Sequence, residues 1–152
     1  MVFSSAGTYG LAARPMYGDI EVFLPDGVTS EGFASRKVTG PIVAAADLVL
    51  TAEADHRTFL IEEYPASFRK ILLMGQFAEA VARSELSGRE LVEHVTRTRP
   101  PARMSHDVRD PYHRGSEANA RAAAEITELL QVIVPALVRT KPGEVRNGSG
   151  PR

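Results

Sequence analysis

The sequence contains no cysteine. This absence excludes disulfide bridges, thiolate zinc ligands and a cysteine nucleophile within the 152 residues. The chain also lacks a Walker loop and a Rossmann glycine fingerprint, the common glycine-rich phosphate-binding motifs. None of the four histidines pairs with another at the i, i+4 spacing with a third ligand nearby; they are His56, His94, His106 and His113. We therefore expect neither a metal nor a cofactor.

Long hydrophobic segments are absent as well. The longest apolar run, residues 41–54, is interrupted by Asp47 and Glu53 and is too short to cross a bilayer. Residues 1–5 lack the basic region and apolar core of a signal peptide. These features predict a cytoplasmic protein without membrane insertion.

The charge balance and the composition indicate an ordinary globular protein. Eighteen basic and nineteen acidic residues give a formal net charge of -1, so nothing favours nucleic acid as a partner. Hydrophobic residues make up 43%, enough to bury a core. We expect one domain over residues 1–140. Residues 141–152, with three glycines and two prolines, are typical of a disordered tail.

Apolar strand-like runs alternate with helical patterns along the chain, which predicts an α/β fold with a parallel sheet. Short strands are expected at 2–6, 47–51 and 70–74, and helices at 15–24, 41–46, 53–64, 76–83 and 88–95, with a final amphipathic helix capped by Ser116. Residues 84–109 are polar and contain prolines, so we interpret them as a connection or lid beside the site rather than as core.

The segment richest in reactive side chains is 107–114, just before the final helix. It holds two carboxylates, two guanidinium groups, an imidazole and a phenol. Asp110 precedes Pro111, which keeps it extended or in a turn, and a carboxyl fixed in this way suits a general acid. The same residues also make ordinary turn chemistry, with Asp110 as a local cap. Both interpretations stay open on residue type alone.

Other candidate residues give weaker signals. Residues 4–8 follow the first expected strand, where open parallel sheets bind ligands, yet they equally fit a strand end with a glycine turn. His56 and His94 are expected to be solvated, and His113 is the one histidine near a candidate acid. The arginines at 97, 99 and 103 are more typical of a solvated face than of an anion site.

Taken together, these segments resemble the bacterial low-molecular-weight protein tyrosine phosphatases. The resemblance runs in order along most of the chain. It rests on Ser4-Ser5-Ala6-Gly7-Thr8 followed by Pro15, on Ala34-Ser35-Arg36-Lys37-Val38-Thr39, on Ala46-Asp47-Leu48-Val49-Leu50-Thr51 followed by His56-Arg57, and on Asp110-Pro111-Tyr112 before the last helix.

The resemblance implies a three-layer α/β fold, with a small parallel sheet flanked by helices, and hydrolysis of phosphotyrosine through a cysteinyl-phosphate intermediate. In this family the aspartate of Asp-Pro-Tyr protonates the leaving phenol, a role that falls on Asp110. Tyr9, Tyr112 and His113 match positions that wall the substrate pocket. The implied partners are a phosphotyrosine protein substrate and a bacterial tyrosine kinase.

The chain departs from the family pattern at its beginning. The first strand, the phosphate loop of the pattern Cys, five residues, Arg, and the following helix are missing, so we expect an N-terminally incomplete domain that is inactive as it stands. The alternative is a catalytically dead module that binds a phosphoprotein or a partner, for which a pocket of Arg36, Arg109 and Arg114 would be a sign. Arsenate reduction on the same fold needs several cysteines and is rejected.

Overall fold

The computed structural model describes residues 1–9 and 12–139. Its elements in chain order are α1 (Gly18–Glu21), α2 (Gly40–Ala45), β1 (Val49–Thr51), α3 (Ala54–Glu63), the 3-10 helix η1 (Pro65–Lys70), β2 (Ile71–Leu73), α4 (Met74–Ala82), α5 (Gly88–Thr98), the 3-10 helix η2 (Met104–His106) and α6 (Ser116–Val138). The tail expected at 141–152 lies outside the described residues.

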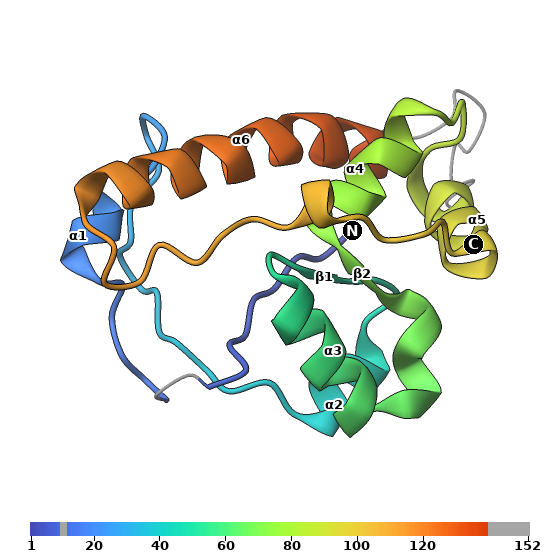
Figure 1. The fold of residues 1–152 in the computed structure, drawn as a ribbon, viewed down its shortest axis with the longest axis horizontal. Coiled ribbons are helices and arrows are strands. Elements are labelled where there is room, and N and C mark those ends of the chain that lie inside the picture. The colour runs from blue at the N-terminus through green and yellow to red at the C-terminus, as the bar shows by residue number, and fades with distance from the viewer. Residues whose placement is uncertain (10–11, 140–152) are drawn as a thin grey trace, which may run out of the picture.

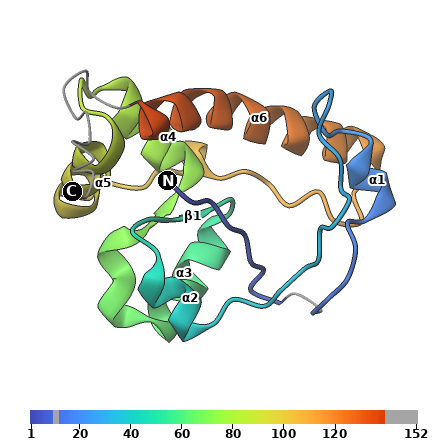
Figure 2. The ribbon, with the colours of Figure 1, turned by 180° about the vertical axis from the view of Figure 1, so that it is seen from behind.

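The elements form three layers around a small parallel sheet, so the predicted α/β class is confirmed. The two strands β1 and β2 lie in the middle, with α2, α3 and η1 on one side and the long helix α6 with α4 and α5 on the other (Figures 1 and 2). Within the described ranges, no helix combines the length and the apolar character needed to cross a membrane.

Helices cover both faces of the sheet, which explains why every strand residue except Thr51 is apolar. β1 pairs with β2 in parallel, with Leu50 opposite Leu72. Leu72 packs into the cluster beneath α4, α5 and α6, whereas its neighbour Ile71 packs into the cluster beneath α2 and α3. Successive side chains of one strand therefore pack into the two cores on opposite faces of the sheet.

The strand expected at residues 2–6 is not formed. A single parallel bridge forms just after it, between Gly7 and Lys37, and Val2 and Phe3 remain 94% and 58% exposed. Two backbone hydrogen bonds hold the bridge: Gly7 donates to the Arg36 carbonyl, and Val38 donates to the Gly7 carbonyl, both at 2.9 Å. The segment pairs with neither β1 nor β2, and an isolated pair of short chains is too weak to extend into a sheet.

The interpretation of residues 84–109 as a lid rather than core is wrong for α5. This helix is longer than expected and carries Leu91, Val92 and Val95 into the cluster beneath α6. The three side chains recur at i, i+1 and i+4, so a narrow apolar stripe on an otherwise charged helix is enough to dock it.

α6 begins at Ser116 as a helix, but Gly115 occupies the N-cap and no side chain caps the first turn. Pro135 lies inside the helix without ending it, because the helix continues to Val138. Ala122 and Ile133 of this amphipathic helix are buried, whereas Leu130 is 41% exposed.

Replacing Leu91 by alanine tests whether α5 belongs to the core. Leu91 is fully buried, so Leu91→Ala should lower the free energy of unfolding in urea by about 2–5 kcal/mol. The matched control is Leu130→Ala on α6, whose exposed side chain should cost less than about 1 kcal/mol. If the two variants lost the same free energy of unfolding, α5 would not be part of the core.

Candidate functional site

The segment that carries Asp110 is joined to the start of α3 by three hydrogen bonds. The Val108 N–H donates to the Ala52 carbonyl at 3.0 Å, and the Asp110 N–H donates to Glu53 Oε1 at 2.8 Å. In return the Ala54 N–H, at the first residue of α3, donates to Asp107 Oδ1. An acceptor carboxylate suits this position, because the first N–H groups of a helix have no partner within the helix.

Asp110 also shapes the turn that follows it. Its Oδ1 accepts the Tyr112 N–H at 3.0 Å, and the Arg114 N–H closes the turn on the Pro111 carbonyl at 3.0 Å. His113 adopts a left-handed conformation with φ 56°. The cap-like role considered from the sequence is therefore present. It occupies one carboxyl oxygen and leaves the other without a hydrogen-bond partner among the described residues.

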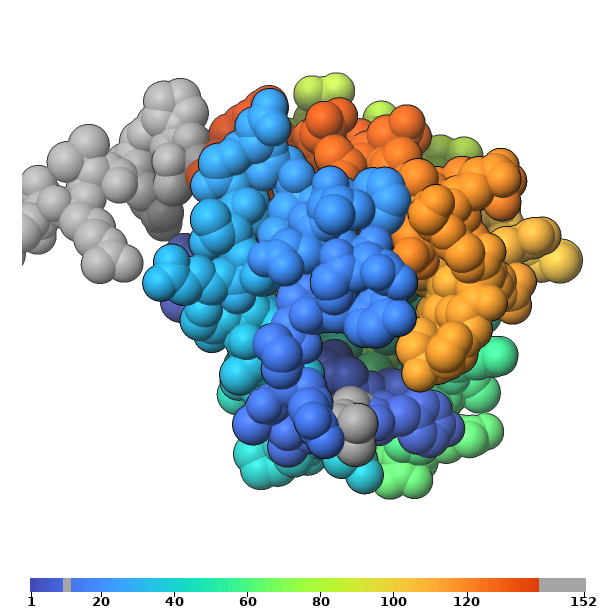
Figure 3. Space-filling view, turned by 90° about the vertical axis from the view of Figure 1, so that its left-hand side faces the viewer, coloured from blue at the N-terminus to red at the C-terminus, as the bar shows by residue number. Residues whose placement is uncertain are grey.

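A cavity of ≈ 200 Å³ lies beside Asp110. Its walls come from α1, from the start of α3, from the Asp110 segment and from the first half of α6; the lining residues are Ile20, Ala52, Glu53, His56, Val108, Arg109, Asp110, Pro111, Asn119, Ala122, Ala123 and Ile126. Figure 3 shows this side of the molecule, with the chain around α1 next to the Asp110 segment and the start of α6. The lining is mainly apolar and includes a few polar groups, as in many ligand sites.

Glu53 and His56 are site residues that the sequence analysis missed. Glu53 holds the Asp110 backbone, and its other oxygen lies 3.3 Å from His56 Nδ1. His56 keeps 35% of its side chain exposed, so it remains in contact with solvent, but it also lines the cavity, which the sequence analysis did not predict. His113 is therefore not the one histidine near the candidate acid. The i, i+3 spacing of Glu53 and His56 at the start of a helix was the available signal.

The three residues predicted to wall the pocket occupy two places. Tyr112 and His113 stay with Asp110, and their rings lie 4.0 Å apart between centroids, with Tyr112 68% exposed. Tyr9 packs instead against Phe59 of α3, at 5.6 Å between ring centroids, and is 79% exposed. α3 connects the two places, since Phe59 lies one helical turn beyond His56.

The basic pocket considered from the sequence is assembled only in part. Arg109 lines the cavity, whereas Arg36 Nε donates to the Ser5 carbonyl at 2.7 Å and so holds the N-terminal segment. Residues 4–7 are exposed. Among residues 1–9 and 12–139, no group of three or more histidine and carboxylate side chains could hold a metal ion.

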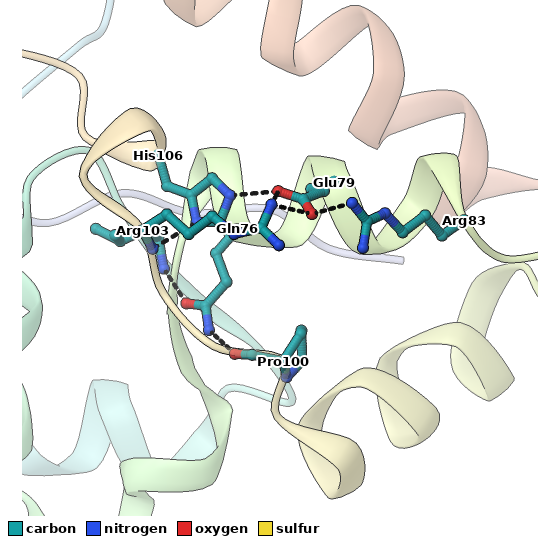
Figure 4. Close-up of polar contacts among 7 residues, drawn as sticks. Gln76, Glu79, Arg83, Pro100, Arg103 and His106 are labelled. Carbon is teal, nitrogen blue, oxygen red and sulfur yellow. Dashed lines mark hydrogen bonds and ion pairs between the residues drawn. The ribbon is translucent and has the colours of Figure 1, made fainter.

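A second anchor fixes the other end of the Asp110 segment (Figure 4). His106 is buried at the end of η2, and its Nδ1 accepts the Arg103 N–H at 3.1 Å. The ring proton is therefore on Nε2, which donates to Glu79 Oε2 on α4 at 2.7 Å. Arg103 and Arg83 donate to the same carboxylate at 2.7 Å and 2.6 Å. One glutamate thus holds a histidine and two arginines.

Gln76 and Gly75 complete this anchor. The Gln76 Oε1 accepts the Leu73 N–H at 3.1 Å, and its amide nitrogen donates to the Pro100 carbonyl (Figure 4). Gly75 lets η2 approach α4, because a Cβ at this position would lie 2.7 Å from the Cα of His106. Side-chain bonds and a glycine contact therefore position a segment that has little regular structure.

The hydrogen bond from His106 holds the pKa of Glu79 below its ordinary value, and the charges of Arg103 and Arg83 act in the same direction. Desolvation opposes this shift without reversing it. The ionised carboxylate is thus the form that the fold stabilises.

Comparison with known proteins now confirms the predicted relation to the low-molecular-weight phosphatases. A curated homologue, the low molecular weight protein-tyrosine-phosphatase Etp of Escherichia coli, is 34% identical over 76 residues, which are 49% of this chain and 51% of Etp. The chain therefore spans about half the length of the curated relatives that it matches. No family model matches the sequence.

Two solved structures share the fold. The YwlE arginine phosphatase from Geobacillus stearothermophilus has a TM-score of 0.62 at 17% identity, over 84% of this chain and 68% of that one. The Erwinia amylovora tyrosine phosphatase amsI has a TM-score of 0.65 at 17% identity, over 88% of this chain and 73% of that one. The three-layer fold expected from the sequence is that of both structures.

Replacing Gly75 by alanine should dislodge η2 from α4. The added Cβ would meet the backbone of His106, which cannot move aside as a flexible side chain would, so we expect a loss of about 1–3 kcal/mol in the free energy of unfolding. Gly18→Ala is the matched control, because nothing lies within 4 Å of its Cβ position. A Gly75→Ala variant as stable as Gly18→Ala would show that the close approach does not exist in solution.

The Glu79 anchor should give the stability a recognisable pH dependence. A carboxyl whose pKa is lowered by folding stabilises the protein above its ordinary value of 4.5, and this contribution disappears as the pH falls through the lowered folded value. In urea unfolding, the wild type should therefore have a higher free energy of unfolding than Glu79→Gln near neutral pH. The two free energies should converge as the pH is lowered. Glu85→Gln, an exposed control, should follow the wild type throughout. A Glu79→Gln difference that is constant with pH would contradict this role.

Proposed function

We propose that this homologue of the low-molecular-weight protein-tyrosine-phosphatases contributes the general acid of phosphotyrosine hydrolysis, and that this acid is Asp110. The supporting observation is the carboxyl of Asp110 at the edge of a cavity, on backbone that is anchored at both ends. The attacking thiolate has no counterpart in these 152 residues, which contain no cysteine.

The chemistry divides between two groups. In a complete site, a cysteine thiolate attacks phosphorus, and the departing phenolate oxygen takes the proton of Asp110. Water then attacks the cysteinyl phosphate and returns a proton to the Asp110 carboxylate. Such an acid must hold its position to within hydrogen-bond reach of the leaving oxygen. The bonds to Glu53 and Tyr112 supply that restraint and leave one carboxyl oxygen free.

The aromatic residues favour an aryl phosphate as substrate. Tyr112 and His113 follow Asp110 and Pro111 and are exposed. Their rings can stack on a phenyl group, whereas an alkyl phosphate offers no ring to stack on. Tyr9 would extend this wall along α3. We therefore propose phosphotyrosine in a protein as the substrate class, with a bacterial tyrosine kinase as the corresponding partner.

Without a thiolate, the 152-residue chain should not turn over by itself. Its serine hydroxyls lack the low pKa of an activated thiol and cannot easily replace it. A catalytically dead module that binds a phosphoprotein is the second candidate. The exposed aromatic side chains of Tyr9 and Tyr112 and the guanidinium of Arg109 beside the cavity favour it.

A fusion protein tests the role of Asp110. The first strand, the Cys, five residues, Arg loop and the helix that follows it in a low-molecular-weight phosphatase would be placed ahead of residue 1, and hydrolysis of p-nitrophenyl phosphate would be measured. We expect activity in the fusion and a decrease of about 10²–10⁴-fold in kcat on Asp110→Asn, the usual effect of losing a general acid. Vanadate affinity should be unchanged.

The control is Asp26→Asn, an exposed aspartate in a turn away from the cavity, which should keep the full rate. Equal rates for the fusion and its Asp110→Asn variant would remove Asp110 from the mechanism. If the fusion folds but is inactive, and the 152-residue chain binds a phosphotyrosine peptide in calorimetry, the binding module is the correct function.

A further inference from the structure

Two arginines, Arg69 and Arg99, lie against the ring of Phe68 at the end of β2 opposite to Asp110, and the charge of a third, Arg57, acts on Arg99. Arg57 lies on α3, Arg69 on η1, and Arg99 at the C-cap of α5. We call these three residues the arginine cluster. Arg99 Nη1 donates to the carbonyl of Ile71, the first residue of β2, at 3.2 Å. The Asp110 segment is instead bonded to Ala52, just past the carboxyl end of β1.

Neutral groups hold the cluster in place. Arg99 Nη1 also donates to the Phe68 carbonyl, and Arg69 Nη1 donates to the Arg97 carbonyl at 3.3 Å. The guanidinium carbons of Arg69 and Arg99 each lie 5.2 Å from the centroid of the Phe68 ring. Carbonyls and a ring face orient the guanidinium groups without neutralising them.

No carboxylate pairs with the cluster among the described residues. The ion pairs of the described residues are made by other arginines, namely Arg83, Arg89, Arg103 and Arg121, while His56 and His106 contact Glu53 and Glu79. Arg57 Nε is buried and has no hydrogen-bond partner within residues 1–9 and 12–139. A buried donor without a partner is costly, and most such groups in folded proteins find one.

The three positive charges also repel one another. Burial lowers the pKa of Arg99 first, and the charges of Arg57 and Arg69 lower it further. The sequence analysis interpreted the arginines at 97, 99 and 103 as a solvated face. That interpretation is wrong for Arg99, which is half-buried with its guanidinium bonded to the backbone. Arg103 is exposed, as expected, and is also bound to Glu79.

We propose that the arginine cluster of Arg57, Arg69 and Arg99 is a binding site for a phosphate group, separate from the Asp110 site. Planar guanidinium groups match the oxygens of phosphate in pairs, and a doubly charged anion would neutralise the repulsion and accept the unpaired N–H of Arg57. The ligand is inorganic phosphate or the phosphate of a small monoester.

Thermal unfolding of the 152-residue protein tests this site. Inorganic phosphate, added at constant ionic strength against chloride, should raise the Tm in a saturable way, by about 3–6 °C at ten times its Kd. Arg57→Gln and Arg69→Gln should each abolish most of this rise. Arg89→Gln is the control, because it removes an exposed arginine of α5 outside the cluster and should retain the rise. Glycerol 3-phosphate, run in parallel, separates the two sources: a lower Kd than that of phosphate assigns the site to monoesters.

A spectroscopic measurement keeps the proposal testable if a variant fails to fold. In the ¹⁵N NMR spectrum of the wild type, added phosphate should shift the Nε–H signal of Arg57. The Kd obtained from this shift should equal the Kd obtained from the rise in Tm. The proposal is overturned if chloride raises the Tm as much as phosphate, or if Arg57→Gln keeps the full rise. It is also overturned if Arg109→Gln removes the rise, because phosphate then binds at the Asp110 cavity.

Discussion

The position of Asp110 depends on an exchange of hydrogen bonds between two segments more than fifty residues apart in the sequence. Glu53, just before α3, accepts the N–H of Asp110, while Asp107 accepts the N–H of Ala54 at the first residue of α3. Each carboxylate satisfies a backbone donor that has no partner in its own segment. Because β1 fixes the chain just before Glu53, the sheet determines where the candidate acid lies.

The same principle operates at the other end of the segment. Glu79 binds His106 and Arg103, and Gly75 lets their backbone approach α4. The segment between these anchors needs little secondary structure of its own, since helices packed on the sheet hold it at both ends. A carboxyl held in this way needs no reorganisation before it transfers a proton, which is the requirement for an efficient general acid.

The features that the sequence predicts are those encoded by neighbouring residues. Continuous apolar runs locate β1 and β2, and Asp110 before Pro111 locates a rigid carboxyl. The features it misses depend on distant contacts. His56 joins the cavity only because Asp110 docks on α3, and Leu91 is core only because α6 covers it. At residues 2–6 the local pattern favours a strand, but a strand requires a neighbouring strand, and the chain forms one bridge only at Gly7, just after this segment.

The central claim is that Asp110 donates the proton to the leaving phenol. The most direct test measures hydrolysis by the fusion protein over a series of aryl phosphates whose leaving phenols differ in pKa, with and without Asp110→Asn. An acid matters most when the leaving group is poor. The account predicts that the rate of hydrolysis depends only weakly on the pKa of the leaving phenol when Asp110 is present. In the Asp110→Asn variant the rate should fall steeply as the phenol pKa rises. Parallel dependences would contradict it.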